Sequence, residues 1–155
     1  MFQDFTTIRI AGNTVELCPR CRSQLVHRSE FCDSRHLQRN KDHVFVFGDN
    51  LDRFGFGGAA ILRYEPNTYG FITKKHPDNE DGSFYTVEEY KDVFEEELEL
   101  LKKEITEHPE KLYLITKLGA GLANKYKIWE NVIQERLTEL PDEFENVRLL
   151  FDPND

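Results

Sequence analysis

The stretch HVFVFGDNLDRFGFGGAAILRY, residues 43–64, determines how the rest of the chain can be arranged. Its first part, Val44 to Phe47, consists of β-branched and aromatic residues without a polar break, which is typical of a strand buried on both faces of a parallel sheet. Gly48 ends this run, and a glycine-rich segment leads into the short apolar segment AAILRY. The stretch therefore predicts a buried strand, a glycine-rich turn and a brief helix over Gly57 to Tyr64.

This order of elements favours a bound anion. Unpaired backbone N–H groups and the positive end of a helix dipole converge where a glycine-rich turn enters a helix. The glycines do not form a Walker loop, since no Gly-Lys-Ser/Thr follows. Gly55 to Ala60 fits the looser G-x-G-x-x-A form of the dinucleotide fingerprint, but it begins several residues after the strand ends. A tight turn that needs glycine for a positive φ is the alternative interpretation.

A second stretch, LYLITKLGAGLANKYKIWE, residues 112–130, repeats this pattern. An apolar strand, Leu112 to Ile115, is followed by a glycine-bearing turn, Gly119 to Gly121, and then by helical spacing. In open α/β sheets, ligands bind beyond the carboxyl ends of the strands. We therefore expect the two loops to face each other across one cleft and to hold a diphosphate from both sides.

Length and charge limit the classes of function. With 155 residues, the chain can bury one α/β core. Its net charge of −9 argues against an electrostatic nucleic-acid binder, because phosphate contacts need clusters of Lys and Arg. No segment approaches the roughly 18 apolar residues of a membrane span, and MFQDF at the amino terminus lacks a signal-peptide layout. We expect a soluble, cytoplasmic protein without a membrane partner.

The remaining elements alternate between strands and helices. Thr86 and Glu89 form a capping box, and the helix that they start is expected to end before Pro109. The other expected elements are a hairpin at 6–10 and 14–17, a short helix or connector within 33–42, strands at 69–73 and 147–151, and a final helix at about 128–140. This alternation favours a mixed or parallel sheet covered on both faces.

The three cysteines precede this α/β region. Cys18, Cys21, Cys32 and His36 would supply three thiolates and an imidazole, which suit tetrahedral zinc, and His27 is a rival fourth ligand. The alternative is three small buried hydrophobic residues. A redox role is disfavoured because no helix-forming run follows the Cys-x-x-Cys directly. We expect residues 1–39 to form a hairpin and an extension stapled by structural zinc, and residues 40–155 to form the α/β domain.

The two loops resemble those of macrodomains. The run VFVFGDNLDRFGFGGAAIL resembles the macrodomain segment in which a buried strand ends in an asparagine before a glycine-rich loop, and YLITKLGAGLANKYKIWE resembles the second loop over the diphosphate. The resemblance covers about Asp42 to Leu137 and is closest to a compact, phage- and bacteria-associated group of uncharacterised proteins. It implies a macrodomain-like three-layer α/β/α fold with a mixed sheet, and ADP-ribose or a related NAD-derived nucleotide as the ligand.

The resemblance also implies roles for individual residues. Asn50 would contact the distal ribose, and the two sides of the diphosphate would meet Gly57, Gly58 and Ala59 on one loop and Gly119, Ala120, Gly121 and Leu122 on the other. Gly48, Thr73 and Lys117 stand at strand exits and are expected to line the same cleft. The chain lacks the usual Gly-Asp-Ile-Thr after the first strand, so the adenine contact is not assigned. The cysteine-rich amino terminus also has no place in the family pattern.

Several side chains are candidates for chemistry on such a ligand. Asp49 is the expected general base, Asn50 would orient the ribose, and Asp52 is a weaker alternative base. Lys117 could form a covalent adduct with an opened ribose if it is buried, because burial lowers the pKa of a lysine. The aromatic residues that could stack on a base are Phe54, Phe56, Tyr126 and Trp129.

Two main functions remain open at this point. The first is an enzyme, an ADP-ribosyl hydrolase acting on a protein, a nucleic acid or a small molecule. The second is a binding module that sequesters the nucleotide without turning it over, which is favoured by the absence of a His/Asp or Cys/His pair inside either loop. A third and weaker interpretation makes the amino terminus a zinc-stapled adaptor that contacts a protein or RNA.

Overall fold

A four-stranded sheet forms the centre of the computed structural model, which describes residues 7–10, 13–16 and 32–154. In spatial order the strands are β4 (Thr68–Lys74), β3 (His43–Asn50), β5 (Leu112–Ile115) and β6 (Val147–Leu149). All three neighbouring pairs are parallel. The α/β class is confirmed, but the predicted mixed sheet is wrong for this sheet, because each connection returns the chain to the same end before the next strand begins.

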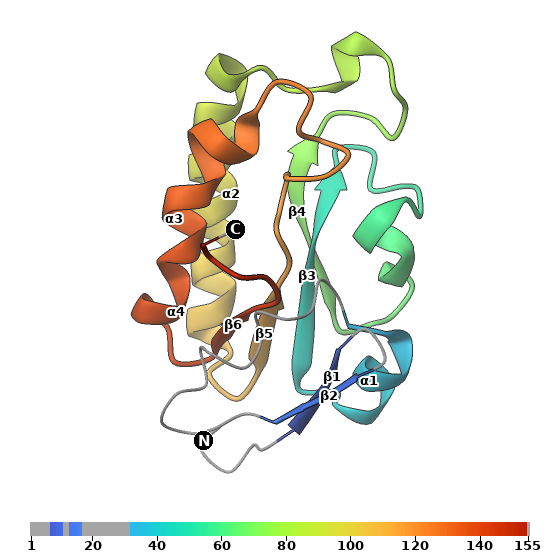
Figure 1. Ribbon diagram of the computed structural model, residues 1–155, viewed down its shortest axis with the longest axis vertical. Helices are drawn as coiled ribbons and strands as arrows, with labels where there is room; N and C mark the ends of the chain where they lie inside the picture. The colour runs from blue at the N-terminus through green and yellow to red at the C-terminus, as the bar shows by residue number, and fades with distance from the viewer. Residues whose placement is uncertain (1–6, 11–12, 17–31, 155) are drawn as a thin grey trace.

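Helical segments lie on either side of the sheet (Figure 1), and apolar side chains cover both of its faces. Along β3, Val44 and Val46 join one buried cluster, and Phe45 and Phe47 join the other, as the alternation of a strand requires. Helix α2 (Val87–Glu107) and the carboxyl-terminal helices pack on the first face. The second face is covered by residues of α1 (Ser34–Arg39) and of the 3-10 helix η2 (Gly58–Leu62).

The long helix α2 agrees with its prediction. The Thr86 side chain accepts a hydrogen bond from the Glu89 amide at 3.2 Å, and the Glu89 carboxylate accepts one from the Thr86 amide at 3.0 Å. This capping box satisfies two donors that the first turn would otherwise leave unpaired. The helix ends at Glu107, before Pro109, and its buried residues are those at helical spacing: Tyr90, Phe94, Leu98, Leu101 and Ile105.

Other elements differ in detail from their predictions. The expected final helix is divided into a π-helical turn η4 (Trp129–Ile133), α3 (Gln134–Thr138) and α4 (Leu140–Glu143). Pro141 fits the first turn of α4, where the missing N–H of proline has no helical partner, so a new short helix begins there. The brief helix after the first loop is the 3-10 helix η2, and a second 3-10 turn, η3, spans Asp81–Ser83. The expected hairpin is present as β1 (Thr7–Ile10) and β2 (Asn13–Glu16).

The order of the strands reverses between β3 and β5. From β3 the chain passes through η2 to β4 on one side, and from β4 it passes through α2 to β5 on the other side of β3. The loops that follow β3 and β5 therefore diverge to opposite faces and leave a crevice at the carboxyl ends of these two strands. Among the described residues, no helix combines the length and the apolar character that a membrane crossing requires.

Candidate functional site

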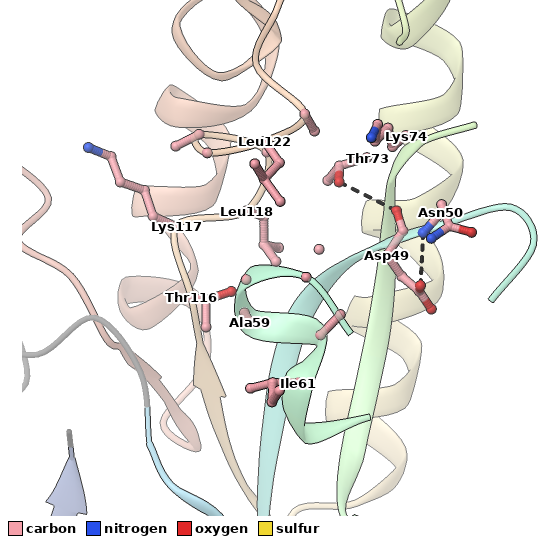
Figure 2. Close-up of a pocket in the computed structure, with 18 of the residues that line it drawn as sticks. Asp49, Asn50, Ala59, Ile61, Thr73, Lys74, Thr116, Lys117, Leu118 and Leu122 are labelled. Atoms are coloured by element: carbon pink, nitrogen blue, oxygen red, sulfur yellow. Dashed lines mark hydrogen bonds between the residues drawn. The ribbon is translucent and has the colours of Figure 1, made fainter. Parts of the chain in front are cut away.

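A cavity of about 850 Å³ lies at this point of reversal. The loop after β3 contributes residues 54–62 to its wall, and the loop after β5 contributes residues 116–123 (Figure 2). Every residue predicted to bind the ligand lines the cavity: Gly48, Asp49, Asn50, Gly57, Gly58, Ala59, Thr73, Lys117, Gly119, Ala120, Gly121 and Leu122. The expected geometry, with Gly57 and Gly121 opening onto one cleft, is therefore present.

The floor of the cavity is closely packed around two glycines, Gly48 and Gly119, which leave little room for a side chain. A Cβ on Gly48 would lie 3.0 Å from Oγ1 of Thr73 and 3.7 Å from the amide nitrogen of Gly119. Gly119 has a φ of +79°, and a Cβ there would lie 2.6 Å from Cδ1 of Ile133. A larger residue at Gly119 would therefore combine backbone strain with a clash against the helical layer.

Apolar side chains surround the mouth of the cavity. Leu122 reaches from the second loop towards the first, where its Cδ1 would lie 3.4 Å from a Cβ on Gly57. The exposed fractions are 66% for Phe54, 54% for Phe56 and 68% for Leu122. Large apolar groups gathered at the mouth of a cavity mark a binding surface. Two of the candidate stacking aromatics, Phe54 and Phe56, therefore line the cleft, whereas Trp129 is buried against Phe151.

Asp49 has a structural environment that the sequence did not reveal. Its side chain is 2% exposed and accepts hydrogen bonds from Arg63 at 2.6 and 3.1 Å and from Arg53 at 3.1 Å. The backbone N–H of Asn50 donates to the same carboxylate at 2.8 Å. Gly70 lies against it on β4, where a Cβ would overlap Oδ2. Both oxygens of this carboxylate are occupied by guanidinium groups, so this geometry favours an anchoring role over the predicted role of general base.

Asn50 closes the turn that follows β3. Its Nδ2 donates to the Phe54 carbonyl at 2.8 Å, and its Oδ1 accepts from the Asp52 amide at 3.0 Å. The pairing of β3 with β4 shifts register beside it, because Asp49 pairs with Ile72 and Asn50 with Lys74. Asn50 thus shapes the first loop, and one N–H and one lone pair of its amide remain for a ligand.

Lys74 is the cation at the exit of β4. It lines the cavity, and its Nζ donates to the Asp78 carbonyl at 2.6 Å rather than to a carboxylate. Burial lowers the pKa of Lys74, while the charge of Asp78 opposes that shift. The Nζ atom of Lys74 also lies 4.6 Å from the centre of the Phe84 ring. A lysine in this position can move its ammonium group onto a bound anion.

Lys117 lies on the other wall. It lines the cavity, but Figure 2 shows its side chain extending away from Asp49 and Asn50. Its Nζ lies 5.4 Å from the centre of the Trp129 ring, a cation–π distance. This orientation does not favour the adduct that a lysine buried in the cleft would form.

Only part of the predicted zinc site falls within the described residues, since Cys18 and Cys21 lie outside them. Cys32 is fully buried, and burial raises the pKa of its thiol. Burial also lowers the pKa of His36 to about 4, and its Nε2 lies 2.8 Å from Nδ1 of His43. No group of three or more potential metal ligands occurs within the described part of the chain. The zinc site therefore stays a prediction that depends on Cys18 and Cys21.

A histidine–carboxylate pair lies beside the cleft and was not expected. Nδ1 of His76, after β4, is 2.9 Å from Oδ2 of Asp52, after β3. Neither loop contains both residues, so inspection of each loop by itself could not find the pair. Arg63 was missed for a similar reason, because its role depends on a carboxylate fourteen positions earlier in the chain.

Comparison with known proteins gives a family without an activity. A family model described as a family of unknown function (DUF7831) matches residues 27–127. The matched residues include β3, β4, α2, β5 and both loops of the cleft. No curated protein and no solved structure matches the chain.

Proposed function

The chain belongs to the family of unknown function DUF7831, whose matched residues contain both cleft loops, and we propose that this cleft binds ADP-ribose or a related NAD-derived nucleotide. One observation supports the proposal above the others. The cavity lies where the strand order reverses, between the loops that follow β3 and β5, and both walls carry glycines. This is the position at which open α/β sheets bind nucleotides and other phosphorylated ligands.

The charges around the cavity agree with an anionic ligand. Among the described residues, the acidic members of its wall are Asp49 and Asp152, and Asp49 is neutralised by Arg53 and Arg63. Lys74 brings a cation to the wall without a carboxylate on its ammonium group. A diphosphate would therefore enter a site that attracts it locally, although the whole chain carries a charge of −9.

The dimensions and the apolar mouth agree with a nucleotide. A cavity of about 850 Å³ is within the range of pockets that enclose small molecules. Phe54 and Phe56 present exposed rings at its mouth, where a base could stack. The diphosphate would then lie deeper, along the backbone of Gly57, Gly58 and Gly119 to Gly121.

The macrodomain-like character of the fold is part of the same proposal. It is supported by the order of the two loops and by apolar clusters on both faces of the sheet. The parallel sheet differs from the mixed sheet that the resemblance implied.

Binding without turnover is the form of the proposal that needs the fewest chemical groups. Backbone amides and a side chain that contacts the ribose are sufficient for it, and the predicted base, Asp49, is occupied by two arginines. ADP-ribosyl hydrolysis remains the second candidate, and the His76–Asp52 pair is the observation that favours it.

Thermal melting tests the proposal. Purified protein should melt at a higher temperature with ADP-ribose, because a ligand that binds only the folded state stabilises it. Adenosine and ribose 5-phosphate, each lacking the diphosphate bridge, should shift melting less. If neither ADP-ribose nor NAD raises the melting temperature, the proposed function is wrong.

Structural zinc is a separate proposal for the amino-terminal extension. Cys32 and His36 provide a thiol and an imidazole, donor types that zinc prefers, and Cys18 and Cys21 would complete the set. Metal analysis of purified protein should find zinc in the wild type and less in Cys18→Ser. Equal metal content in both proteins would contradict this proposal.

A further inference from the structure

His76 and Asp52 form an orientated pair between the loops after β3 and β4. Nδ1 of His76 lies 2.9 Å from Oδ2 of Asp52. The side chains are 51% and 47% exposed, so solvent and solutes can reach both. Within the described part of the chain, Nε2 of His76 makes no hydrogen bond. The pair therefore leaves the second ring nitrogen available to a ligand or to water.

The backbone fixes this pair at the rim of the cavity. The Leu51 amide donates to the carbonyls of Lys74 and Lys75 at 3.2 and 3.1 Å, which ties the two loops together directly before the pair. Beyond the pair the loops meet again, because a Cβ on Gly55 would lie 3.3 Å from Cβ of Pro77.

Residues that line the cavity stand on both sides of the pair in each loop. Along the chain, Asn50 and Phe54 flank Asp52, and Lys74 and Pro77 flank His76. The pair therefore belongs to segments that form the rim of the cavity, and its imidazole is exposed there.

A carboxylate on Nδ1 gives the imidazole a defined chemical role. The hydrogen bond holds the ring in one orientation, and in a neutral imidazole that donates from Nδ1 to the carboxylate, Nε2 carries the lone pair. We infer that His76 is the general base of the cleft and that Asp52 is its positioning residue, an inference that rests on the proposed function and extends it to hydrolysis of an ADP-ribosyl linkage.

The reaction requires only water as a co-reactant. Nε2 of His76 takes a proton from the water while the water oxygen forms a bond to the anomeric carbon of the distal ribose. The bond from that carbon to the oxygen of the leaving group breaks, and the leaving group departs with the electron pair as a carboxylate or phosphate. The imidazolium then loses its proton to solvent, and ADP-ribose is the product.

The other two candidates for a chemical role, Asp49 and Lys117, are poorly placed for it. The carboxylate of Asp49 holds Arg53 and Arg63. The side chain of Lys117 extends away from the ribose end predicted at Asn50 (Figure 2). His76 is exposed, is held by Asp52, and is flanked in the chain by residues that line the cavity.

The experiment measures hydrolysis of two probes, ADP-ribose 1″-phosphate and a peptide carrying ADP-ribose on a glutamate ester, beside calorimetry with ADP-ribose. The wild type should hydrolyse at least one probe. His76→Ala should lower kcat by about 100-fold or more and leave KM within about twofold, because general-base catalysis acts on the chemical step. Added imidazole should restore part of the lost rate.

Asp52→Asn should lower kcat roughly tenfold or more without weakening ADP-ribose binding, and Asp52→Glu should recover part of that loss. His108 supplies the matched control, because it also faces a carboxylate, that of Glu110 at 3.4 Å, outside the residues that line the cleft. His108→Ala should leave kcat and KM unchanged.

The outcomes separate the inference from the proposed function. A wild type that binds ADP-ribose but hydrolyses neither probe overturns the inference and leaves the binding function intact. Full kcat in His76→Ala, or a loss that imidazole does not restore, also overturns it. A wild type that fails to bind ADP-ribose in calorimetry overturns the proposed function, and the inference with it.

Discussion

Arg63 holds both carboxylate oxygens of Asp49, with Nη2 at 2.6 Å from Oδ1 and Nη1 at 3.1 Å from Oδ2. Its Nε also donates to the Gly55 carbonyl at 2.8 Å. One guanidinium group therefore connects the end of β3 to the glycine-rich loop that forms a wall of the cleft. The shape of this loop depends on a buried ion pair and not only on its glycines.

Arg63→Ala should destabilise the fold by about 3 kcal/mol, because it removes the main partner of a buried carboxylate. Asp49 is 2% exposed and Arg63 is 17% exposed in their side chains, so water replaces the lost partner poorly. Urea unfolding measures the change in the free energy of unfolding. Arg53→Ala is the control, because Arg53 meets the same carboxylate but is 53% exposed.

The Arg53 variant should lose about 1 kcal/mol or less, as exposed ion pairs do. Equal losses in the two variants would contradict the anchoring role of Arg63. Arg63→Ala should also weaken ADP-ribose binding, because the Gly55 carbonyl loses its hydrogen bond from Arg63 and the first loop is no longer held in place.

Gly119→Ala should cost about 2 kcal/mol, from a non-glycine residue at positive φ and a clash with Ile133. Gly121→Ala is the matched control in the same loop. A Cβ there meets no atom within 4 Å, and its φ lies outside the left-handed region. In chemical denaturation, the free energy of unfolding of Gly121→Ala should therefore be close to that of the wild type. If both variants unfold alike, the close contact at the cleft floor is misassigned.

Glu97 gives the stability of the edge strand a dependence on pH. Burial raises the pKa of this carboxyl group, and its Oε1 accepts a hydrogen bond from the Ile72 amide of β4 at 2.7 Å. A carboxyl with a raised pKa binds more protons in the folded than in the unfolded state, so its contribution to stability falls as pH rises from the ordinary value of 4.5 through the folded pKa.

Glu97→Gln keeps an acceptor oxygen and removes this titration. The free energy of unfolding of the variant, relative to the wild type, should increase as pH rises across that window. Measurement at several pH values by urea unfolding checks the sign. A difference that is constant with pH, or that decreases as pH rises, would show that Glu97 does not titrate as described.

Lys74→Gln should weaken ADP-ribose binding about fivefold to tenfold, because the ammonium group no longer meets the phosphates. The loss should be larger at low ionic strength, where charge interactions are less screened. Lys91→Gln is the control, since Lys91 is exposed and paired with Glu88 on α2. Calorimetry at two salt concentrations distinguishes the variants, and an equal effect of both would exclude a specific role for Lys74.

The position of the cleft followed from local patterns. Two apolar strands each end at a glycine-bearing turn, and the carboxyl ends of parallel strands meet at one edge, so the sequence alone predicts that Gly57 and Gly121 line one cavity, as they do. The capping box of α2 and its buried stripe were equally local, because they depend on residues three or four positions apart.

Pairings across the sheet could not be predicted in this way. Arg63 meets Asp49, and His76 meets Asp52, only because β4 returns beside β3 in a particular register. The direction of each strand likewise depends on the crossovers, so the sequence left mixed and parallel sheets open. The last helix is divided by the π-helical turn that begins at Trp129 and by Pro141 at the start of α4, and helical spacing alone did not reveal this division.

The central claim is that the cleft between the two glycine loops holds the nucleotide, and a variant that fills this cleft tests it most directly. A Cβ on Gly121, which lines the cavity, meets no atom within 4 Å, so Gly121→Tyr can place a ring in the cavity without disturbing the fold. Gly82 has the same open space, and it does not line the cavity.

Calorimetric titration with ADP-ribose should therefore show binding to the wild type and to Gly82→Tyr, and none to Gly121→Tyr, with the same melting temperature for all three unliganded proteins. ADP-ribose binding to Gly121→Tyr with unchanged affinity would contradict the account, because the nucleotide would then lie elsewhere.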